Sequence, residues 1–563
     1  MRDDLTANIQ ASNNGVTGSR NLVTIKDQDG KYHHILIDCG YFQEEKWKYL
    51  NYLDDVNVDK IEAIILTHNH IDHTGLVPKL VNRGYRGPIY CTDITAELLT
   101  DYWMDSLKMQ PDECKKMREK YPDSRINFKP LFTLEDVKIA RLLVVAFPYK
   151  QTIRILPDVP NIQVTLFNNG HLLGAAYVLL QIIDYRKNRK NLNFLFTGDF
   201  CNRNPFYPVD ELPNWVKKLE LVIVTESTYG TTKTTDIVEC FEENLKEAFR
   251  KKQNILIGAF AQGRMQQVLQ KLRKMQKNGD IPSEYEIYFD GPLGIRTTYK
   301  YESIFDWFCP EVKEFKPDEI KVANPKARQS FLDDVGNGKL KILVTTSGML
   351  SNGPAKEYVP LFLGHNNTLI HLTGYAAEGT LARKLIDCQY DSEITLGGQT
   401  ITKKAEIKTT REFSLHPMKD EIEEFLTQFA IPPIVFIIHG EPFVKESLAD
   451  ELVQKFTAGS NKKIKQVEVL DRSCFYRIRQ AAPDLSYVYS EFNDEGKRYN
   501  SVEVKRMPSK FVEYEHMLGK EVDRKNRGVN KVQQEKVQLH AKKGKSSRHN
   551  DRGYRRPRKN SWR

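Results

Sequence analysis

The sequence contains no Cys-x-x-Cys pair, no long apolar run and no internal repeat. Its eight cysteines are scattered, which argues against a disulfide framework or a cysteine-based zinc site and favours a reducing compartment. No stretch approaches the ~18 continuous apolar residues that a membrane-spanning helix needs. The first ten residues, MRDDLTANIQ, lack the basic and then apolar pattern of a secretory signal. These absences predict a cytoplasmic protein without a membrane anchor.

An excess of basic charge is missing from most of the chain. The 563 residues carry a formal net charge of +10. Residues 520–563 contain 16 Lys or Arg and 4 Asp or Glu, a net charge of +12. Residues 1–519 contain 68 Lys or Arg and 70 Asp or Glu, a net charge of −2. The hydrophobic fraction is 40%, which is enough apolar surface to form a sizeable core. We therefore predict a nearly neutral folded body and a basic, disordered tail over residues 519–563.

The order of strand and helix signals changes twice along the chain. Short apolar or alternating runs such as IEAIILT (61–67) and NFLFTGD (193–199) are typical of strands and dominate the first 230 residues or so. From about Thr231, segments with helical spacing alternate with strand-like runs such as NILIGAF (254–260), which predicts a parallel α/β unit. Strand-rich character resumes past about Thr400. This order predicts one domain inserted into another.

The strongest signal for a site is THNHIDHTG (67–75), which directly follows a predicted strand. It places His68, His70, Asp72 and His73 within six residues. Imidazole and carboxylate groups are suited to zinc and similar divalent ions. On a tight loop, the first two histidines face one metal ion while Asp72 and His73 face a neighbouring one. The spacing therefore predicts a metal site with room for two ions.

Further candidate ligands follow other predicted strands. They are Asp38, His171, Asp199 and His439. Each is weak alone, because a single histidine after a strand is more often a structural residue. Together with the 67–75 array they fit a two-metal site in which a carboxylate bridges ions ~3.5–4 Å apart.

These motifs occur in a specific order. The series DCG, H-x-H-x-D-H, GHLLGA and TGD resembles that of the metallo-β-lactamase fold. TESTYG (225–230), FSLH (413–416) and IHGE (438–441) resemble the three extra motifs of its β-CASP branch, which includes the polyadenylation-site endonuclease and bacterial ribonuclease J. The resemblance runs from about residue 15 to residue 442. It implies an α/β protein: a metallo-β-lactamase αββα sandwich interrupted by an inserted parallel α/β β-CASP domain.

The resemblance also implies domain boundaries. The first part of the sandwich is expected over residues 1–227 and the inserted domain over residues 228–400. The second part of the sandwich is expected over residues 401–484. Residues 485–518 are an extension of uncertain role, and the basic tail follows at 519–563.

The resemblance implies two zinc ions per chain and a role for each ligand. The expected ligands are His68, His70 and His171 for one ion, Asp72, His73 and His439 for the other, and Asp199 as the bridge between them. Asp38 is expected to orient ligands. Histidine at position 439 is similar to the RNA-processing members, whereas members of the DNA-repair branch carry valine there.

The catalytic residues implied by the resemblance are Asp72, Asp199, His416 and Glu226. His416 is the candidate general acid, because imidazole titrates near neutral pH, and Glu226 is expected beside it. Arg264, at the start of a predicted helix, is a candidate for binding the substrate phosphate. Ser347 and Gly348 are further candidates, at the end of another strand. Taken singly, each of these three positions is more often an ordinary turn.

The function predicted from the sequence is hydrolysis of single-stranded RNA by a two-zinc ribonuclease that leaves 5′-phosphate and 3′-hydroxyl ends, in RNA processing or decay. Three alternatives stay open: a DNA nuclease of the repair branch, a small-ester hydrolase, and an inactive RNA-binding scaffold. The basic tail is expected to bind RNA or an acidic partner. The sequence does not distinguish endonucleolytic from exonucleolytic cleavage, and an oligomer is compatible with it.

Overall fold

The structure is a computed structural model of the chain. It describes residues 5–479, except for 13–14, 160, 186–190, 205, 208, 239, 304–320, 323, 325, 375, 377–378, 460–461 and 473, together with residues 488–489 and 507–508. The predicted basic tail at 519–563 lies outside the described residues. Only two short strands are described within the predicted extension at 485–518.

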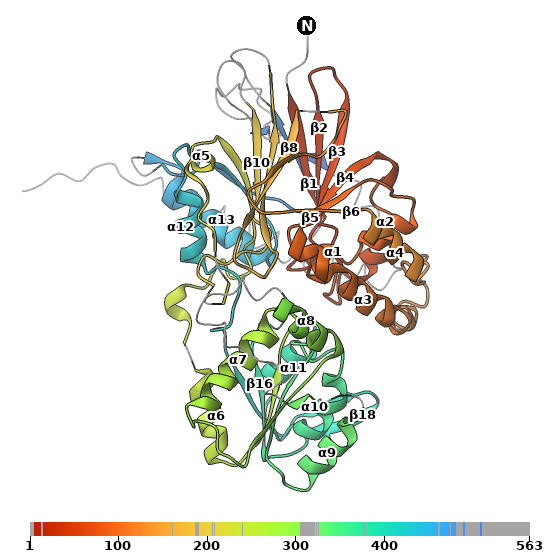
Figure 1. The fold of residues 1–563 in the computed structure, drawn as a ribbon, viewed down its shortest axis with the longest axis vertical. Coiled ribbons are helices and arrows are strands. Elements are labelled where there is room, and N and C mark those ends of the chain that lie inside the picture. The colour runs from red at the N-terminus through yellow and green to blue at the C-terminus, as the bar shows by residue number, and fades with distance from the viewer. Residues whose placement is uncertain are drawn as a thin grey trace, which may run out of the picture.

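The upper part of Figure 1 is a sandwich of two β-sheets. The first sheet has the strand order β23 (Val488–Tyr489), β22 (Cys474–Arg479), β1 (Thr6–Ala11), β2 (Asn21–Lys26), β3 (Tyr32–Ile37), β4 (Ile61–Ile65), β5 (Ile89–Thr92) and β6 (Val144–Phe147), and β24 (Met507–Pro508) also pairs with β22. The alternation of buried and half-buried residues in β1 and β2 follows from the period of two of a strand with one face in the core.

The second sheet packs face to face on the first. Its strand order is β21 (Gln466–Val469), β20 (Ile434–Ile437), β11 (Leu221–Thr225), β10 (Leu192–Phe196), β9 (Ala176–Ile182), β8 (Ile162–Asn168) and β7 (Thr152–Arg154). A continuous apolar core lies between the sheets and includes Ile9 and Val23 from the first and Val164 and Leu180 from the second. Every residue of β9, β10 and β11 is buried, because helices cover the outer face of this sheet.

Helices complete the sandwich on its outer faces. The first sheet is covered by α2 (Val77–Asn82), α3 (Asp93–Lys120) and α4 (Leu134–Leu142). The second sheet is covered by α5 (Asn214–Lys217), α12 (Lys419–Thr427) and α13 (Pro442–Phe456). The short helices are α1 (Ile71–Thr74) and the 3-10 turns η1 (Lys48–Tyr52), η2 (Val58–Lys60) and η3 (Thr234–Asp236). The αββα layering predicted from the sequence is confirmed.

The lower part of Figure 1 is the inserted domain, a six-stranded parallel sheet between two layers of helices. The strand order is β14 (Lys321–Val322), β13 (Glu286–Asp290), β15 (Lys341–Thr345), β12 (Asn254–Gly258), β16 (Thr368–Leu372) and β19 (Glu406–Thr409). One face packs on α6 (Phe241–Arg250) and α7 (Arg264–Lys277), followed by α8 (Pro292–Ser303). The other packs on α9 (Arg328–Gly336), α10 (Ala355–Leu363) and α11 (Leu381–Asp387).

The insertion occurs between two strands that are neighbours in the sandwich. Strand β11 pairs directly with β20 in parallel, and the chain between them forms the inserted domain before it returns to the sandwich through α12. The hairpin of β17 (Glu393–Leu396) and β18 (Gln399–Thr402) precedes β19, which pairs with β16. The inserted sheet thus continues past residue 400, where the sequence analysis placed the end of the insertion.

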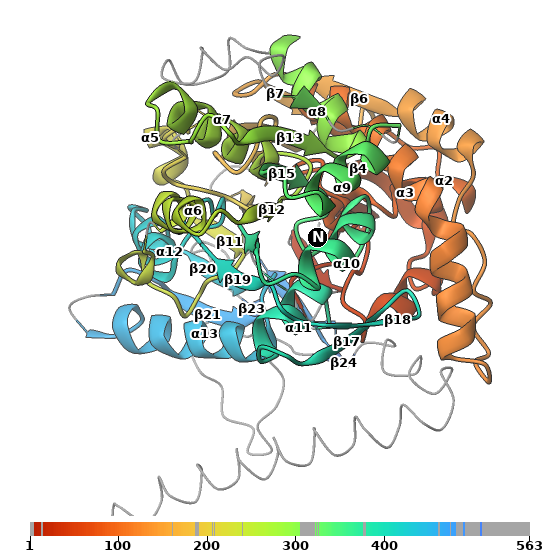
Figure 2. The same ribbon diagram turned by 90° about the horizontal axis from the view of Figure 1, so that it is seen from below.

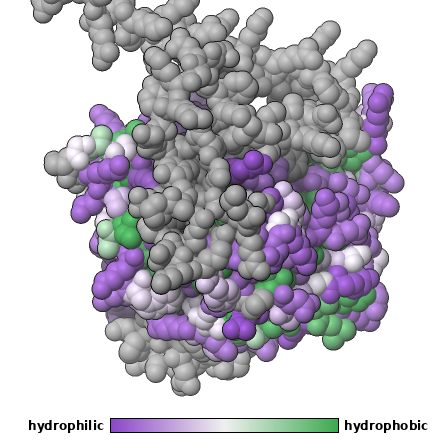
Figure 3. Space-filling view, turned by 90° about the horizontal axis from the view of Figure 1, so that it is seen from above, coloured by the Kyte–Doolittle hydropathy of each residue, from purple (hydrophilic) through white to green (hydrophobic). Residues whose placement is uncertain are grey.

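Figures 2 and 3 show the molecule from its two ends. From below, the helices of the inserted domain surround its sheet (Figure 2). From above, the described surface in view is mainly hydrophilic, with hydrophobic residues in small groups (Figure 3). Among the described residues, no helix combines the length and apolar character required to cross a bilayer.

Candidate dinuclear metal centre

The predicted ligands meet because they follow strands that end at the same edge of the sandwich. His68 follows β4, His171 follows β8, Asp199 follows β10 and His439 follows β20. Glu226 follows β11, so the parallel pairing of β11 with β20 places it beside the His439 loop. The inserted domain abuts this edge: the His171 ring hydrogen-bonds to the segment that returns from the insertion. Side chains that are far apart in the sequence therefore converge where the two domains meet.

The candidate ligand atoms form two groups that share one carboxylate. The groups are His68, His70, His171 and Asp199, and Asp72, His73, Asp199 and His439. Within each group the ligand atoms lie within 4.8 Å of one another. This is the division that the sequence analysis expected, with Asp199 common to both.

The donor set fits two divalent cations. His68 Nε2 is buried and has no hydrogen-bond partner among the described residues, and buried Asp199 Oδ1 faces only the rings of His73 and His439 there. His73 Nε2 lies 3.3 Å from Asp199 Oδ1, and His68 Nε2 lies 3.7 Å from Asp199 Oδ2. A buried polar atom without a partner is costly, and a bound cation would satisfy both atoms. Imidazole and carboxylate donors in this number are typical of zinc sites.

Burial keeps the three histidines of the first group neutral. It is the largest cause that lowers the pKa of His68 and His171 well below the usual value, and it lowers the pKa of His70 to about 4. Neutral imidazole is the form that binds a metal ion. These three side chains can therefore act as ligands at neutral pH without first losing a proton.

The second group attracts positive charge. Burial acts to lower the pKa of His73, but Asp199 and Asp38 together raise it well above its usual value. Burial likewise opposes protonation of His439, yet Asp199 and a hydrogen bond with Asp72 raise its pKa to about 9. The carboxylates that would hold protons on these rings would hold a cation in the same place.

Asp38 orients two of the predicted ligands. Its Oδ2 accepts a hydrogen bond from His73 Nδ1 at 2.8 Å and one from the Thr67 hydroxyl at 2.9 Å. Because the hydroxyl proton is used in this way, Thr67 Oγ1 accepts from His68 Nδ1 at 3.0 Å. Both rings thus present Nε2 toward Asp199. Asp38 itself has φ 62°, a strained conformation for a residue with a side chain.

His171 depends on the returning segment of the inserted domain. Its Nδ1 donates to the carbonyl oxygen of Leu415 at 2.6 Å, which leaves Nε2 facing the metal site. Leu172 and Leu415 pack together in a small apolar cluster. Gly263, at the start of α7, has φ 74°, and a Cβ there would lie 2.5 Å from Leu172 Cδ2. A candidate ligand on the sandwich is therefore positioned by the segment that returns from the inserted domain.

His416 and Glu226 form a pair beside the metal ligands. His416 Nδ1 lies 2.9 Å from Glu226 Oε2, and the ring centroid lies 4.9 Å from that of His171. Burial acts to lower the pKa of His416, but the Glu226 carboxylate and Asp199 raise it above its usual value. Glu226 is 1% exposed and also accepts from the Phe200 backbone N–H at 2.8 Å. The imidazolium form of His416 is therefore favoured, with Nε2 free to donate.

Arg264 begins α7 and is buried, and no carboxylate of the described residues forms an ion pair with it. Its Nε and Nη1 have no hydrogen-bond partner among the described residues, and burial lowers its pKa to about 10. A Cβ at Gly374 would come 3.0 Å from Arg264 Nη1, and a Cβ at Gly348 would come 3.0 Å from Phe260 N. These positions follow β12, β15 and β16 at the carboxyl edge of the inserted sheet, the edge at which α/β sheets bind ligands.

Ser347 and Gly348 lie in the turn after β15. Ser347 Oγ accepts from the backbone N–H of Asn352 at 3.3 Å, and its own N–H donates to the Asn352 carbonyl at 3.2 Å. Among the described residues, neither of them forms a hydrogen bond or ion pair with a candidate metal ligand. Their role in binding phosphate therefore stays a prediction, and Arg264 is the stronger candidate.

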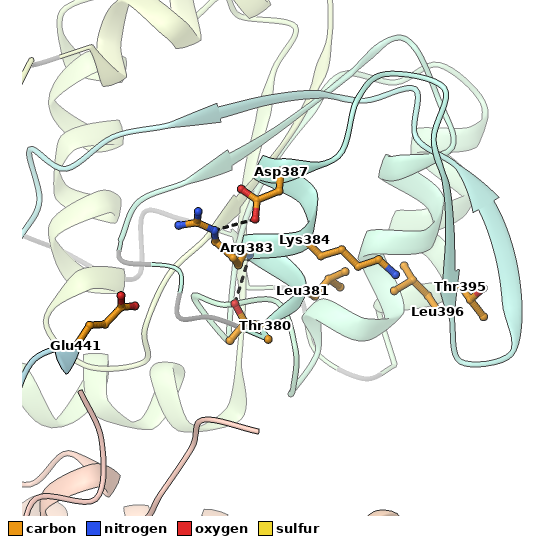
Figure 4. Close-up of a pocket in the computed structure, with 9 residues that line it drawn as sticks. Thr380, Leu381, Arg383, Lys384, Asp387, Thr395, Leu396 and Glu441 are labelled. Atoms are coloured by element: carbon orange, nitrogen blue, oxygen red, sulfur yellow. Dashed lines mark hydrogen bonds and ion pairs between the residues drawn. The ribbon is translucent and has the colours of Figure 1, made fainter. Parts of the chain in front are cut away.

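A separate hollow of about 770 Å³ opens beside the His439 loop. It is lined by Gly379, Thr380, Leu381, Arg383, Lys384, Asp387, Thr395, Leu396 and Glu441 (Figure 4). Arg383 pairs with Asp387, and Lys384 extends toward the β17–β18 hairpin. The two cations are matched by the carboxylates of Asp387 and Glu441. The hollow therefore offers no net positive charge to a phosphate backbone.

Three groups that support the site were not identified from the sequence. They are Thr67, Thr228 and the carbonyl of Leu415. The two threonines lie inside motifs that the sequence analysis quoted, so their nearness to ligands was a usable signal. A backbone carbonyl leaves no such signal, because any residue supplies one.

Three family models match this chain in order. The metallo-beta-lactamase superfamily model matches residues 22–168, and the Beta-Casp domain model matches residues 265–385. The model of the Zn-dependent metallo-hydrolase RNA specificity domain matches residues 400–464. The matches agree with a sandwich that is interrupted by the inserted domain.

Curated archaeal proteins are similar over most of the chain. Transcription termination factor FttA of Methanosarcina mazei is 29% identical over 75% of this chain and 65% of its own length. The FttA of Methanococcus maripaludis is 30% identical over 72% of this chain and 63% of its own length. An RNase J-like protein of Methanocaldococcus jannaschii is 27% identical over 76% of this chain and 91% of its own length. The chain thus spans just under two thirds of the length of these two termination factors. With its domains matched in order, the chain belongs to the β-CASP branch of the metallo-β-lactamase superfamily, as the motif series predicted.

Proposed function

We propose that this chain is a two-zinc ribonuclease that hydrolyses single-stranded RNA and leaves 5′-phosphate and 3′-hydroxyl ends. The observation that carries the proposal is the pair of ligand groups sharing Asp199, with His416 and Glu226 immediately beside them. An inactive scaffold would be expected to lack ligands, whereas every expected ligand is present in this sequence.

The chemistry follows from the side chains around the reacting phosphate. A bound pair of zinc ions supplies Lewis acidity to the phosphate oxygens and lowers the pKa of water at the site. His416 Nε2 donates a proton to the departing 3′-oxygen, which is a poor leaving group as an alkoxide. Glu226 holds the Nδ1 proton of His416 and favours its cationic form. Asp38 and Thr67 hold His73 and His68 with Nε2 toward the metal positions.

RNA is the proposed substrate class. The match to an RNA specificity domain over residues 400–464 and the similarity to an RNase J-like protein support it. Histidine at position 439 supports RNA over the DNA substrates of the repair branch. Cleavage of RNA in processing or decay fits the cytoplasmic location expected from the sequence.

The proposal is tested by cleavage of matched RNA and DNA strands labelled at the 5′ or 3′ end. Wild type is compared with a double variant, Asp72→Ala and His73→Ala, which removes two ligands of the second group. Wild type should bind about two zinc ions and cleave RNA, and the variant should lose metal and cleavage together. Preference for DNA would favour the repair-branch alternative. Equal RNA cleavage by both proteins would rule out the two-metal mechanism.

Arg264 is the proposed phosphate ligand. An unpaired buried guanidinium destabilises a folded protein, so its presence calls for a ligand that compensates. Phosphate oxygens accept charge-assisted hydrogen bonds from guanidinium, and Nε and Nη1 are donors without a hydrogen-bond partner among the described residues. Tyr229 lies close enough to Arg264 to influence its charge, and the ring centroid of Tyr229 lies 6.2 Å from that of His416. Arg264 is therefore near the proposed general acid.

Arg264→Met should shift stability and RNA affinity in opposite directions. Removing the buried charge should raise the thermal unfolding midpoint of the RNA-free protein, because methionine is apolar and flexible and carries no desolvation cost when buried. RNA affinity should fall about 10- to 100-fold, the value of one or two charge-assisted hydrogen bonds. Lys274→Met on the exposed face of the same helix is the matched control. Lower stability with unchanged affinity would show that Arg264 has a structural role instead.

The basic tail is proposed to raise the local concentration of RNA or of an acidic partner. Its 16 Lys and Arg residues over 520–563 would contact phosphates without sequence preference. Such contacts weaken steeply as salt increases. The tail is thus assigned to binding and not to cleavage.

A further inference from the structure

Thr228 connects the proposed general acid pair to a proposed metal ligand. Its Oγ1 lies 2.6 Å from Glu226 Oε2 and 3.1 Å from His439 Nδ1. All three side chains are buried, with exposed fractions of 8% for Thr228, 1% for Glu226 and 3% for His439. Glu226 also pairs with His416, so the four side chains form one continuous chain of hydrogen bonds.

The direction of each hydrogen bond follows from the donors available. A carboxylate only accepts, so the single hydroxyl proton of Thr228 points to Glu226. The oxygen of Thr228 is then left as an acceptor, and His439 Nδ1 must carry the proton that it receives. In the neutral form of His439, which is the form that binds a metal ion, the tautomer is thereby fixed and the lone pair lies on Nε2. That atom lies 3.4 Å from Asp199 Oδ1 and 3.7 Å from Asp72 Oδ2, among the ligands of the second group.

The same arrangement occurs a second time in the site. Thr67 donates to the buried carboxylate of Asp38 and accepts from His68 Nδ1. Each ligand group therefore contains one histidine whose tautomer is set by a threonine hydroxyl bound to a carboxylate. The two supports differ in one respect: Asp38 also orients a ligand, His73, whereas Glu226 also pairs with His416.

We propose that the Thr228 hydroxyl is a positioning residue that sets the metal affinity of His439, and that Glu226 acts through it as well as through His416. His439 has φ 48°, so its backbone is strained and the ring needs a specific partner to fix its orientation. Loss of a hydrogen bond that orients a ligating histidine typically weakens metal binding by 10- to 100-fold. The inference rests on the proposed function only in assuming that His439 binds a metal ion.

Thr228→Val and Thr228→Ser separate the hydroxyl from the shape of the side chain. Valine keeps the branched shape without a donor or acceptor, and serine keeps the hydroxyl. Zinc affinity is measured by competition with a chelating dye, without RNA. We expect Thr228→Val to bind one of two zinc ions about 10- to 100-fold more weakly, and Thr228→Ser to retain near-normal affinity.

Thr225→Val is the matched control. Thr225 is fully buried at the end of β11, and its hydroxyl bonds only to the neighbouring carbonyl of Glu226 among the described residues. This variant should retain normal zinc affinity. Two zinc ions bound with normal affinity by Thr228→Val would overturn the proposal, as would equal losses in the valine and serine variants. If the valine variant fails to fold, Thr228→Ala, which also lacks the hydroxyl, is measured in its place, and normal affinity for two zinc ions in that variant would overturn the proposal. Because no RNA is present, the result is independent of whether RNA is the substrate.

Discussion

Replacing Asp199 by asparagine is expected to remove metal and to slow cleavage at least about a thousandfold, which corresponds to about 4 kcal/mol. Asparagine keeps the size of the side chain and removes its charge. Asp199 Oδ1 lies 3.3 Å from His73 Nε2 and 3.4 Å from His439 Nε2. Its Oδ2 lies 3.7 Å from His68 Nε2. No other carboxylate belongs to both ligand groups among the described residues, so both ions should be affected.

The experiment combines zinc analysis with single-turnover cleavage of a labelled RNA. Asp210→Asn is the control for removal of one negative charge: Asp210 forms an exposed ion pair with Lys150, and such pairs contribute little. The control should retain two zinc ions and normal cleavage. An Asp199→Asn variant with two zinc ions and near-normal cleavage would contradict a bridging role.

The clustering of the candidate metal ligands could be anticipated from sequence because much of their arrangement is local. Four of them occur in residues 67–75, and a strand followed by a tight loop fixes where such side chains point. The others follow strands whose ends meet at one edge of the sandwich, a rule of layered α/β folds. The order of strand and helix signals likewise sufficed to predict the insertion.

The remaining features depend on contacts that no local pattern encodes. The burial of the Arg264 guanidinium, with no ion pair to any described residue, follows from the packing of the inserted domain around it. The acceptor of His171 is the backbone carbonyl of Leu415, which is distant in sequence. The continuation of the inserted sheet to β19 depends on its pairing with β16, because the strand signal at 406–409 fits either domain.

His416→Ala is expected to lower cleavage by about 10²- to 10⁴-fold, the usual contribution of a general acid, while two zinc ions remain bound. The zinc measurement is decisive, because His416, Glu226 and Asp199 could themselves form a third ligand group. Loss of zinc would make His416 a metal ligand instead of an acid. His365→Ala, at an exposed histidine of the inserted domain, should leave both zinc content and cleavage unchanged.

Glu226→Gln distinguishes the two roles assigned to this carboxylate. If Glu226 served His416 alone, its variant would resemble His416→Ala and retain both zinc ions. Because Thr228 also donates to Glu226, the amide should disturb the acceptor of His439 as well. We therefore expect Glu226→Gln to lose cleavage and to bind one zinc ion more weakly, whereas His416→Ala loses cleavage alone. Both variants lack the His416–Glu226 ion pair, so the difference in zinc affinity between them belongs to Glu226 alone. The connection through Thr228 accounts for that difference if Thr228→Val loses zinc affinity to the same extent, whereas normal affinity in Thr228→Val would make Glu226 a direct ligand.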